Sequence, residues 1–253
     1  MMPNISWIDT RLNQEEMDFL WDAISEKNKE SFSKKLAGNI FKSELIKDKD
    51  NWFFKSTLKK LTERMFYRDW DNFSKYHIEV EEGIPLPEFE MNRFWVNYMK
   101  QHEFNPVHAH SGLYSFVVFM KIPTHWKEQH ALPFSANSNG PCASDFAFVC
   151  SDKGSEEIKT DNFLLSPEDE GKMLFFPATL HHIAYPFYEC EEERITISGN
   201  IQLYDSNRPK MQEMSGSVYE QKKKILKRME NTVKVTKEEL KELKKEREKE
   251  GLN

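Results

Sequence analysis

The sequence predicts an α+β fold in which N-terminal helices accompany an antiparallel barrel or jelly roll. In the N-terminal third, apolar residues recur at helical spacing. Short runs rich in Val, Ile and Phe, separated by turn residues, then follow up to residue 207. The remaining residues are strongly charged. We therefore expect three parts: a helical part (1–84), a β core (85–207) and a charged helical tail (208–253).

Length and composition fit one large domain with appendages. The chain has 253 residues, enough for a sizeable core, and its 31% charged residues indicate a soluble protein. Its 19 Phe predict that aromatic rings fill the core. The net charge of −6 argues against a wholly basic nucleic-acid binder.

The cysteines and the first residues indicate a cytoplasmic protein. The count of 3 Cys is odd and sparse, and no CxxC pair occurs, which disfavours a zinc ribbon and fits a reducing compartment. The segment 1–7 has neither the basic residues nor the apolar run of a signal peptide. The longest apolar run, 116–120, is too short to cross a membrane. We expect no membrane association.

Two amphipathic helices are expected within residues 1–84. Asn13 and Glu16 have the spacing of a capping box, so the first helix should begin there. Four apolar residues share one face of each helix. The first stripe is Met17, Leu20, Trp21 and Ile24, and the second is Phe54, Leu58, Leu61 and Met65. We interpret both stripes as packing faces without chemistry.

Six runs after Pro85 have the composition of β-strands. They cover residues 94–99, 114–122, 143–150, 172–176, 183–187 and 194–203. The segments 124–144 and 153–171 are polar or rich in turn residues, so both are expected to be loops.

The tail is electrostatically distinct from the rest of the chain. Residues 219–250 hold ten Lys and two Arg against eight Glu, a net charge of +4, so the remainder carries −10. Thr236 and Glu239 form a capping box for a helix that extends to about Glu248. We interpret it as a solvated helix. The alternative is a basic arm that docks a partner, which keeps nucleic acid among the candidates.

Histidines carry the clearest chemical signal. His108 and His110 are two residues apart, so on a strand both side chains point to the same side and can share one metal ion. A third, distant His completes the pattern of a non-haem Fe(II) site with open positions. His181 and His182 both qualify, but adjacent strand residues face opposite ways, and periodicity does not choose between them. Arg194 can bind a carboxylate through two parallel hydrogen bonds.

The segment 95–201 resembles the 2-oxoglutarate/Fe(II) oxygenases of bacteria and tailed phages. The resemblance rests on Trp95-Val-Asn97, Asn105-Pro-Val-His-Ala-His110, the apolar strand from Ser115 to Pro123, Phe176-Pro-Ala-Thr-Leu-His-His182 and Glu193-Arg-Ile-Thr-Ile-Ser-Gly-Asn200. It implies a double-stranded β-helix (jelly-roll) core at 85–207. It also implies Fe(II) as the metal, and 2-oxoglutarate and dioxygen as co-substrates.

The resemblance assigns the metal ligands. It implies that His108, His110 and His182 hold Fe(II), with His181 as a neighbour outside the site. The chain departs from the family at His110, because many members carry Asp or Glu there. Three neutral imidazoles would leave more positive charge on the metal and change its redox properties.

The resemblance also assigns the co-substrate site. Arg194 would pair with the far carboxylate of 2-oxoglutarate, and Thr196, Ser198 and Asn97 would complete the site. Phe119 lies where relatives tend to have Tyr, which removes one hydroxyl donor. No catalytic residue beyond the metal ligands is expected.

These assignments describe a 2-oxoglutarate-dependent dioxygenase that hydroxylates an unidentified substrate. One alternative is a three-His dioxygenase of the cupin type that needs no 2-oxoglutarate; His110 favours it and Arg194 opposes it. Another is a non-catalytic, metal-binding jelly roll that docks partners through the tail.

Overall fold

The computed structural model describes residues 7–27, 29–74, 88–151 and 157–204. The chain divides into two units, Met1–Met65 with Glu88–Tyr204, and Phe66–Pro87 with Asp205–Asn253. Of the second unit, only 66–74 are described, as part of helix α2 (Lys59–Ser74). The helix expected between Thr236 and Glu248 lies outside the described residues.

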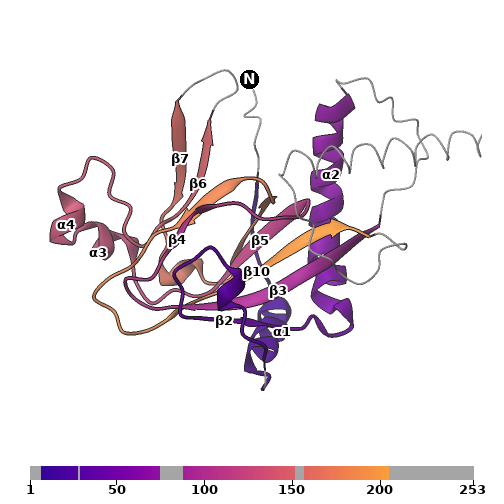
Figure 1. Cartoon of the computed structure of the whole chain (residues 1–253), viewed down its shortest axis with the longest axis horizontal. Helices are drawn as coiled ribbons and strands as arrows, with labels where there is room; N and C mark the ends of the chain where they lie inside the picture. The colour runs from indigo at the N-terminus through magenta and orange to yellow at the C-terminus, as the bar shows by residue number, and fades with distance from the viewer. Residues whose placement is uncertain (1–6, 28, 75–87, 152–156, 205–253) are drawn as a thin grey trace, which may run out of the picture. The chain divides into compact units, whose positions relative to one another are not determined.

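In the described part of the chain, the strands form two antiparallel sheets (Figure 1). The larger contains, in pairing order, β1 (Ile8–Arg11), β8 (Lys172–Pro177), β5 (Tyr114–Lys121), β10 (Arg194–Leu203), β3 (Phe89–Met99) and β2 (Lys42–Leu45). The smaller contains β4 (Asn105–His108), β9 (His181–Ala184), β6 (Phe146–Ser151) and β7 (Ile158–Phe163). This arrangement confirms the expected double-stranded β-helix core.

Four strands were not among the expected ones, and all four are sheet edges. β1 and β2 come from residues 1–84, so that part of the chain is not helical throughout. β7 forms within 153–171, which was expected to be a loop, and its first five residues are exposed. β4 is short and contains Pro106. An edge strand pairs on one side only, so its sequence need not carry the apolar pattern of a buried strand.

The helices begin close to where their capping residues place them. α1 (Gln14–Ser25) starts with the expected capping box, in which the Asn13 side chain accepts from the Glu16 N–H at 2.9 Å and Glu16 accepts from the Asn13 N–H at 2.8 Å. The second helix starts as a π-helical turn, η3 (Phe54–Leu58), and continues as α2. Leu20 is buried as expected, but Trp21 is 37% exposed.

Aromatic packing attaches the helical layer to the larger sheet. The Phe53 ring lies 6.0 Å from the rings of Phe94 on β3 and Phe116 on β5. Phe19 of α1 lies 6.4 Å from Phe53. A second cluster, Val117, Phe119, Ile122, Phe146, Phe148, Leu165, Leu174, Phe176 and Leu180, fills the space between the sheets. Aromatic rings therefore form much of the core, as the Phe content predicts.

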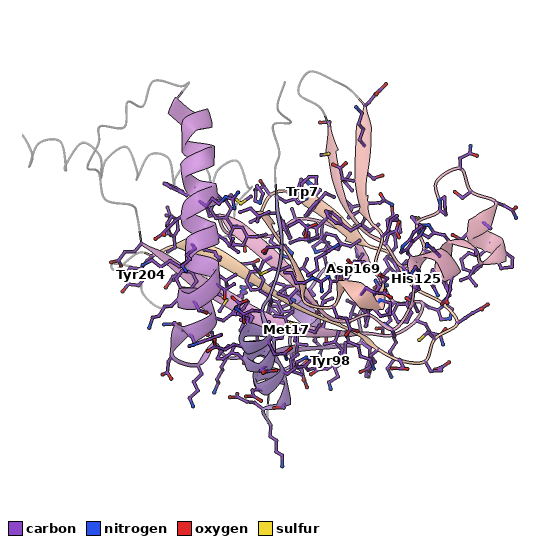
Figure 2. All side chains as sticks on the ribbon, turned by 180° about the vertical axis from the view of Figure 1, so that it is seen from behind. Trp7, Met17, Tyr98, His125, Asp169 and Tyr204 are labelled. Carbon is purple, nitrogen blue, oxygen red and sulfur yellow. The ribbon has the colours of Figure 1, made fainter. Side chains whose placement is uncertain are left out.

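The long segment 124–144 is not entirely a loop. It contains the short helices α3 (Trp126–His130) and α4 (Pro133–Ala136). The Trp126 N–H donates to the Leu165 carbonyl at 3.0 Å, which joins α3 to the turn that holds η4 (Pro167–Asp169). The labelled side chains of His125 and Asp169 mark this junction in Figure 2. The remaining short helices are η1 (Ser33–Lys35) and η2 (Lys49–Asn51). No helix in the described residues is both long and apolar enough for a membrane crossing.

Gly199 is a point of close approach within the larger sheet. A Cβ at this position would lie 2.6 Å from the Phe116 ring and 2.8 Å from the backbone oxygen of Arg93. We expect Gly199→Ala to lower the free energy of unfolding by about 1–3 kcal/mol, because both neighbours are held by strand pairing. Denaturant unfolding measures the change. Gly140→Ala is the matched control, since no atom lies within 4 Å of a Cβ there. Equal stability of the two variants would contradict the argument.

Candidate metal and co-substrate site

The three histidines expected to bind metal surround one point. A ring nitrogen of each lies within 4.8 Å of the corresponding atoms of the others. The ring centroids are 4.2 Å apart for His108 and His182, 4.9 Å for His110 and His182, and 5.0 Å for His108 and His110. The Nε2 atoms of His110 and His182 are 3.1 Å apart. These nitrogens are arranged to share a single ion.

Strand pairing places two of the histidines, and a loop contact places the third. The pairing of β4 with β9 sets His108 directly opposite His182. His110 lies two residues beyond the end of β4, so it does not share a strand with His108 as its spacing had predicted. Its backbone N–H donates to the Ala178 carbonyl at 2.7 Å. This bond, rather than strand alternation, brings His110 to the cluster.

Backbone carbonyls fix the orientation of two rings. The Nδ1–H of His108 donates to the Pro106 carbonyl at 2.7 Å. The Nδ1–H of His182 donates to the Leu180 carbonyl at 3.0 Å. These bonds set the tautomer and leave the Nε2 lone pair of each ring for a metal.

Burial keeps the imidazoles in the form that binds metal. It lowers the pKa of His182 to about 3, and it lowers the pKa of His108 and, more strongly, of His110. All three rings are therefore neutral at neutral pH, as metal ligation requires. Three imidazole donors fit Fe(II), and also zinc, copper and nickel.

The structure separates the two adjacent histidines. His182 is 4% exposed and belongs to the cluster, whereas His181, its neighbour on β9, is exposed to solvent. Strand alternation accounts for the difference, because consecutive side chains point to opposite faces. Periodicity had left this choice open.

The cluster opens into a cavity of about 270 Å³. Alternate residues of two paired strands form one wall: Arg194, Thr196, Ser198 and Asn200 from β10, and Arg93, Trp95, Asn97 and Met99 from β3. All the residues expected to bind metal or co-substrate line this cavity. A single water molecule occupies about 10–15 Å³ of such a cavity, so the cavity is large enough for a small dicarboxylate.

Arg194 presents a buried cation to the cavity. It is 2% exposed, and its Nη2 donates to the carbonyl of Ser144 at 2.9 Å and to the hydroxyl of the same residue. Its Nε has no hydrogen-bond partner in the described residues. Burial lowers its pKa to about 10, against the opposing effect of Asp145, so the guanidinium stays charged at neutral pH. A buried guanidinium with an unpartnered N–H fits the carboxylate of an anionic co-substrate.

Sequence comparison agrees with this geometry. A family model described as "Putative 2OG-Fe(II) oxygenase" matches residues 93–200. The match covers the three histidines, Arg194 and the remaining expected site residues. This segment belongs to the 2OG-Fe(II) oxygenases. The resemblance noted from the sequence motifs is thereby confirmed for the oxygenase segment, with Fe(II), 2-oxoglutarate and dioxygen as the cofactor set that the family implies.

Three solved structures are among those to which this chain is similar. One is an oxidoreductase of the 2OG-Fe(II) oxygenase family from Burkholderia pseudomallei, 13% identical, TM-score 0.32, with 48% of this chain and 47% of that chain covered. A viral collagen prolyl hydroxylase from Paramecium Bursaria Chlorella virus-1 is 13% identical, TM-score 0.40, with 78% and 96% covered. A Pseudomonas putida prolyl-4-hydroxylase is 10% identical, TM-score 0.39, with 80% and 95% covered. A search of curated proteins gave no significant match.

A buried acid that the sequence analysis did not single out lies close to Arg194. Asp145 is fully buried, and its two carboxylate oxygens bond His130 Nε2 and Asn162 Nδ2, each at 2.9 Å. Its negative charge opposes the burial effect on Arg194. Asp145 therefore offsets part of the cost of burying the guanidinium. Its partners come from a loop helix and an edge strand, and no local motif marks them.

Polar contacts also hold the expected co-substrate residues. The side-chain oxygen of Asn97 (Oδ1) accepts from Ser43 Oγ at 2.7 Å. The side-chain nitrogen of Asn97 (Nδ2) donates to Thr196 Oγ1 at 3.5 Å. Ser43 lies on β2, a strand that the sequence did not indicate. Ser198 is 8% exposed and borders the same cavity.

Proposed function

We propose that the chain is an Fe(II)- and 2-oxoglutarate-dependent dioxygenase that hydroxylates its substrate. One observation carries the proposal: three neutral imidazoles converge on one point in the same cavity as Arg194, a buried and incompletely paired cation. When bound, Fe(II) would supply open coordination positions at which 2-oxoglutarate and dioxygen are activated for oxidation of a C–H bond.

The three histidines provide the metal ligands through Nε2. Those of His108 and His182 are already directed by the carbonyl bonds on their opposite nitrogens. His110 is held by its backbone bond to Ala178 and by contact with the Trp95 ring, whose centroid is 5.7 Å away. The ligands are thus positioned by the fold before the ion binds.

Arg194 binds the far carboxylate of 2-oxoglutarate. Its charge is retained in a dry setting, where an ion pair is stronger than in water. Thr196, Ser198 and Asn97 share its side of the paired strands and supply hydroxyl and amide donors. Phe119 and the other aromatic residues of the inter-sheet cluster limit the access of water to the cavity from the core.

A three-His dioxygenase that does not use 2-oxoglutarate is the second candidate. The donor set favours it, because the metal cluster in the described residues contains three histidines and no carboxylate. The buried Arg194 favours the first candidate, because its incompletely paired guanidinium fits the far carboxylate of 2-oxoglutarate.

Oxygen consumption with and without 2-oxoglutarate separates the candidates. We expect the Fe(II)-loaded protein to consume oxygen slowly and to form succinate only when 2-oxoglutarate is present, even without its substrate. Zinc-loaded protein is the matched control, since Zn²⁺ occupies the ligands without redox chemistry. Oxygen uptake that is indifferent to 2-oxoglutarate would favour the second candidate. No turnover under either condition would favour a non-catalytic module.

We infer that the enzyme works in the cytoplasm. Its cysteines, Cys142, Cys150 and Cys190, form no disulfide, which supports a reducing compartment. The charged tail stays a candidate docking element for a partner or nucleic acid, and it lies outside the described residues.

A further inference from the structure

Ser144 lies between the two sheets, in contact with Arg194. It is fully buried and lies two residues before the start of β6. Its backbone N–H donates to the carbonyl of Pro186, just beyond β9 of the smaller sheet, at 2.8 Å. Its hydroxyl oxygen lies 3.0 Å from Thr124 Oγ1, just beyond β5 of the larger sheet. Segments that follow strands of both sheets therefore hold Ser144 in place.

Both oxygens of Ser144 accept hydrogen bonds from one nitrogen of Arg194. The Nη2 of Arg194 donates to the carbonyl oxygen of Ser144 at 2.9 Å and also to its Oγ. A hydroxyl has one donor and two acceptor sites, so Oγ can accept from Arg194 and still bond Thr124. The two bonds restrict the rotation of the guanidinium. They leave the Nε–H without a partner in the described residues, on a side chain that lines the cavity.

The backbone of Ser144 has a conformation that serine rarely adopts. Its φ of 74° lies in the left-handed region, where a Cβ causes steric strain. A glycine would adopt this conformation without strain, but it would have no hydroxyl. Strained residues persist where the surrounding structure holds them, and they are frequent at functional sites. The strain at Ser144 thus indicates that its hydroxyl has a role at Arg194.

Charge and orientation of the buried guanidinium depend on different residues. The negative charge of Asp145 favours the charged form of Arg194, but the carboxylate oxygens of Asp145 bond His130 and Asn162. The guanidinium itself donates to Ser144. A planar guanidinium binds a carboxylate through two parallel hydrogen bonds only when its plane is correctly oriented. Ser144 is therefore placed to set the geometry of this pairing.

We propose that Ser144 is a positioning residue for 2-oxoglutarate, whose hydroxyl orients the Arg194 guanidinium toward the far carboxylate of the co-substrate. The inference rests on the proposed function, because it takes Arg194 as the partner of that carboxylate. Ser144 is not among the residues that line the described cavity, so it acts through Arg194. Loss of the hydroxyl should weaken 2-oxoglutarate binding but not iron binding, since the three histidine ligands lie elsewhere.

Anaerobic calorimetric titration of the Fe(II)-loaded wild type, Ser144→Ala and Ser144→Gly tests this role. The probes are 2-oxoglutarate and 2-oxobutyrate, which has the same 2-oxo acid group but no far carboxylate. We expect both variants to bind 2-oxoglutarate about tenfold more weakly, because a hydrogen bond to a charged group is lost. Both should bind 2-oxobutyrate and iron like the wild type. Ser144→Gly should melt about 2–4 °C above Ser144→Ala, because glycine removes the strain of a Cβ at positive φ.

Glu189→Gly is the matched control for the backbone. Glu189 also has a positive φ, 53°, but it is exposed and does not line the cavity. This variant should bind both probes like the wild type.

Two outcomes would overturn the positioning role while leaving the proposed function intact. One is wild-type affinity of Ser144→Gly for 2-oxoglutarate. The other is an equal loss of affinity for 2-oxoglutarate and 2-oxobutyrate, which would show a general disturbance of the site. Ser144→Gly has no backbone strain, so it decides the question even if Ser144→Ala fails to fold. Failure of the wild type itself to bind 2-oxoglutarate would overturn the proposed function, and this inference with it.

Discussion

His182→Ala is expected to abolish tight Fe(II) binding, whereas His181→Ala is expected to leave it nearly intact. His182 contributes one of the three converging nitrogens, and His181 points away from the cluster into solvent. Loss of residues that merely support a ligand costs about 10–100-fold in metal affinity, so loss of a ligand should exceed that range. Metal analysis after anaerobic loading and desalting measures the difference.

The adjacent pair provides its own control, because both variants remove one imidazole from the same strand. Circular dichroism should show that both variants are folded. His182→Ala removes the contact with the Phe176 ring, whose centroid is 5.0 Å away, but the four-residue strand β9 keeps its backbone pairing. Equal iron loss from the two variants would show that the ligand assignment is wrong.

Arg194→Met is expected to weaken 2-oxoglutarate binding by about two to three orders of magnitude, while iron affinity changes little. The substitution removes the buried cation that faces the cavity but leaves the three nitrogens in place. Titration of 2-oxoglutarate into the iron-loaded, oxygen-free protein measures the effect. Arg194→Lys keeps the charge and loses the planar fork, so we expect an intermediate loss.

An unchanged 2-oxoglutarate titration would remove Arg194 from the co-substrate site. The variant removes one of the charges that favour the ionised form of the buried Asp145, which then keeps only His130 and Asn162 as partners in the described residues, so its thermal stability should be recorded beside the titration. A loss of 2-oxoglutarate affinity in a protein that is still folded and iron-loaded is the informative result.

The site could be predicted largely because its residues lie in short motifs on central strands. Asn97, Arg194, Thr196 and Ser198 share one face of β3 and β10, which strand alternation alone implies. His110 shows the limit of that argument: it lies in the cluster, but a bond to the distant Ala178 puts it there. Asp145 and Ser43 support the site through partners far away in the sequence, and no local pattern encodes such contacts.

The fold was predictable to a similar extent. Central strands such as β5 are buried on both faces, so they appear as continuous apolar runs. The edge strand β7 has one apolar residue at each end and polar residues between them, so it resembles a loop. The domain boundaries at 84/85 and 207/208 stay predictions.

The carbonyl bonds of His108 and His182 have a consequence for how the protein acquires its metal. Both rings are oriented by their own backbone, so a divalent ion meets ligands that need little rearrangement. Such a site offers no mechanical barrier to the wrong ion, and three imidazoles bind copper and zinc more tightly than ferrous iron. The identity of the ion will then follow from which metals the cell keeps scarce, and mismetallation by zinc would silence the protein without unfolding it.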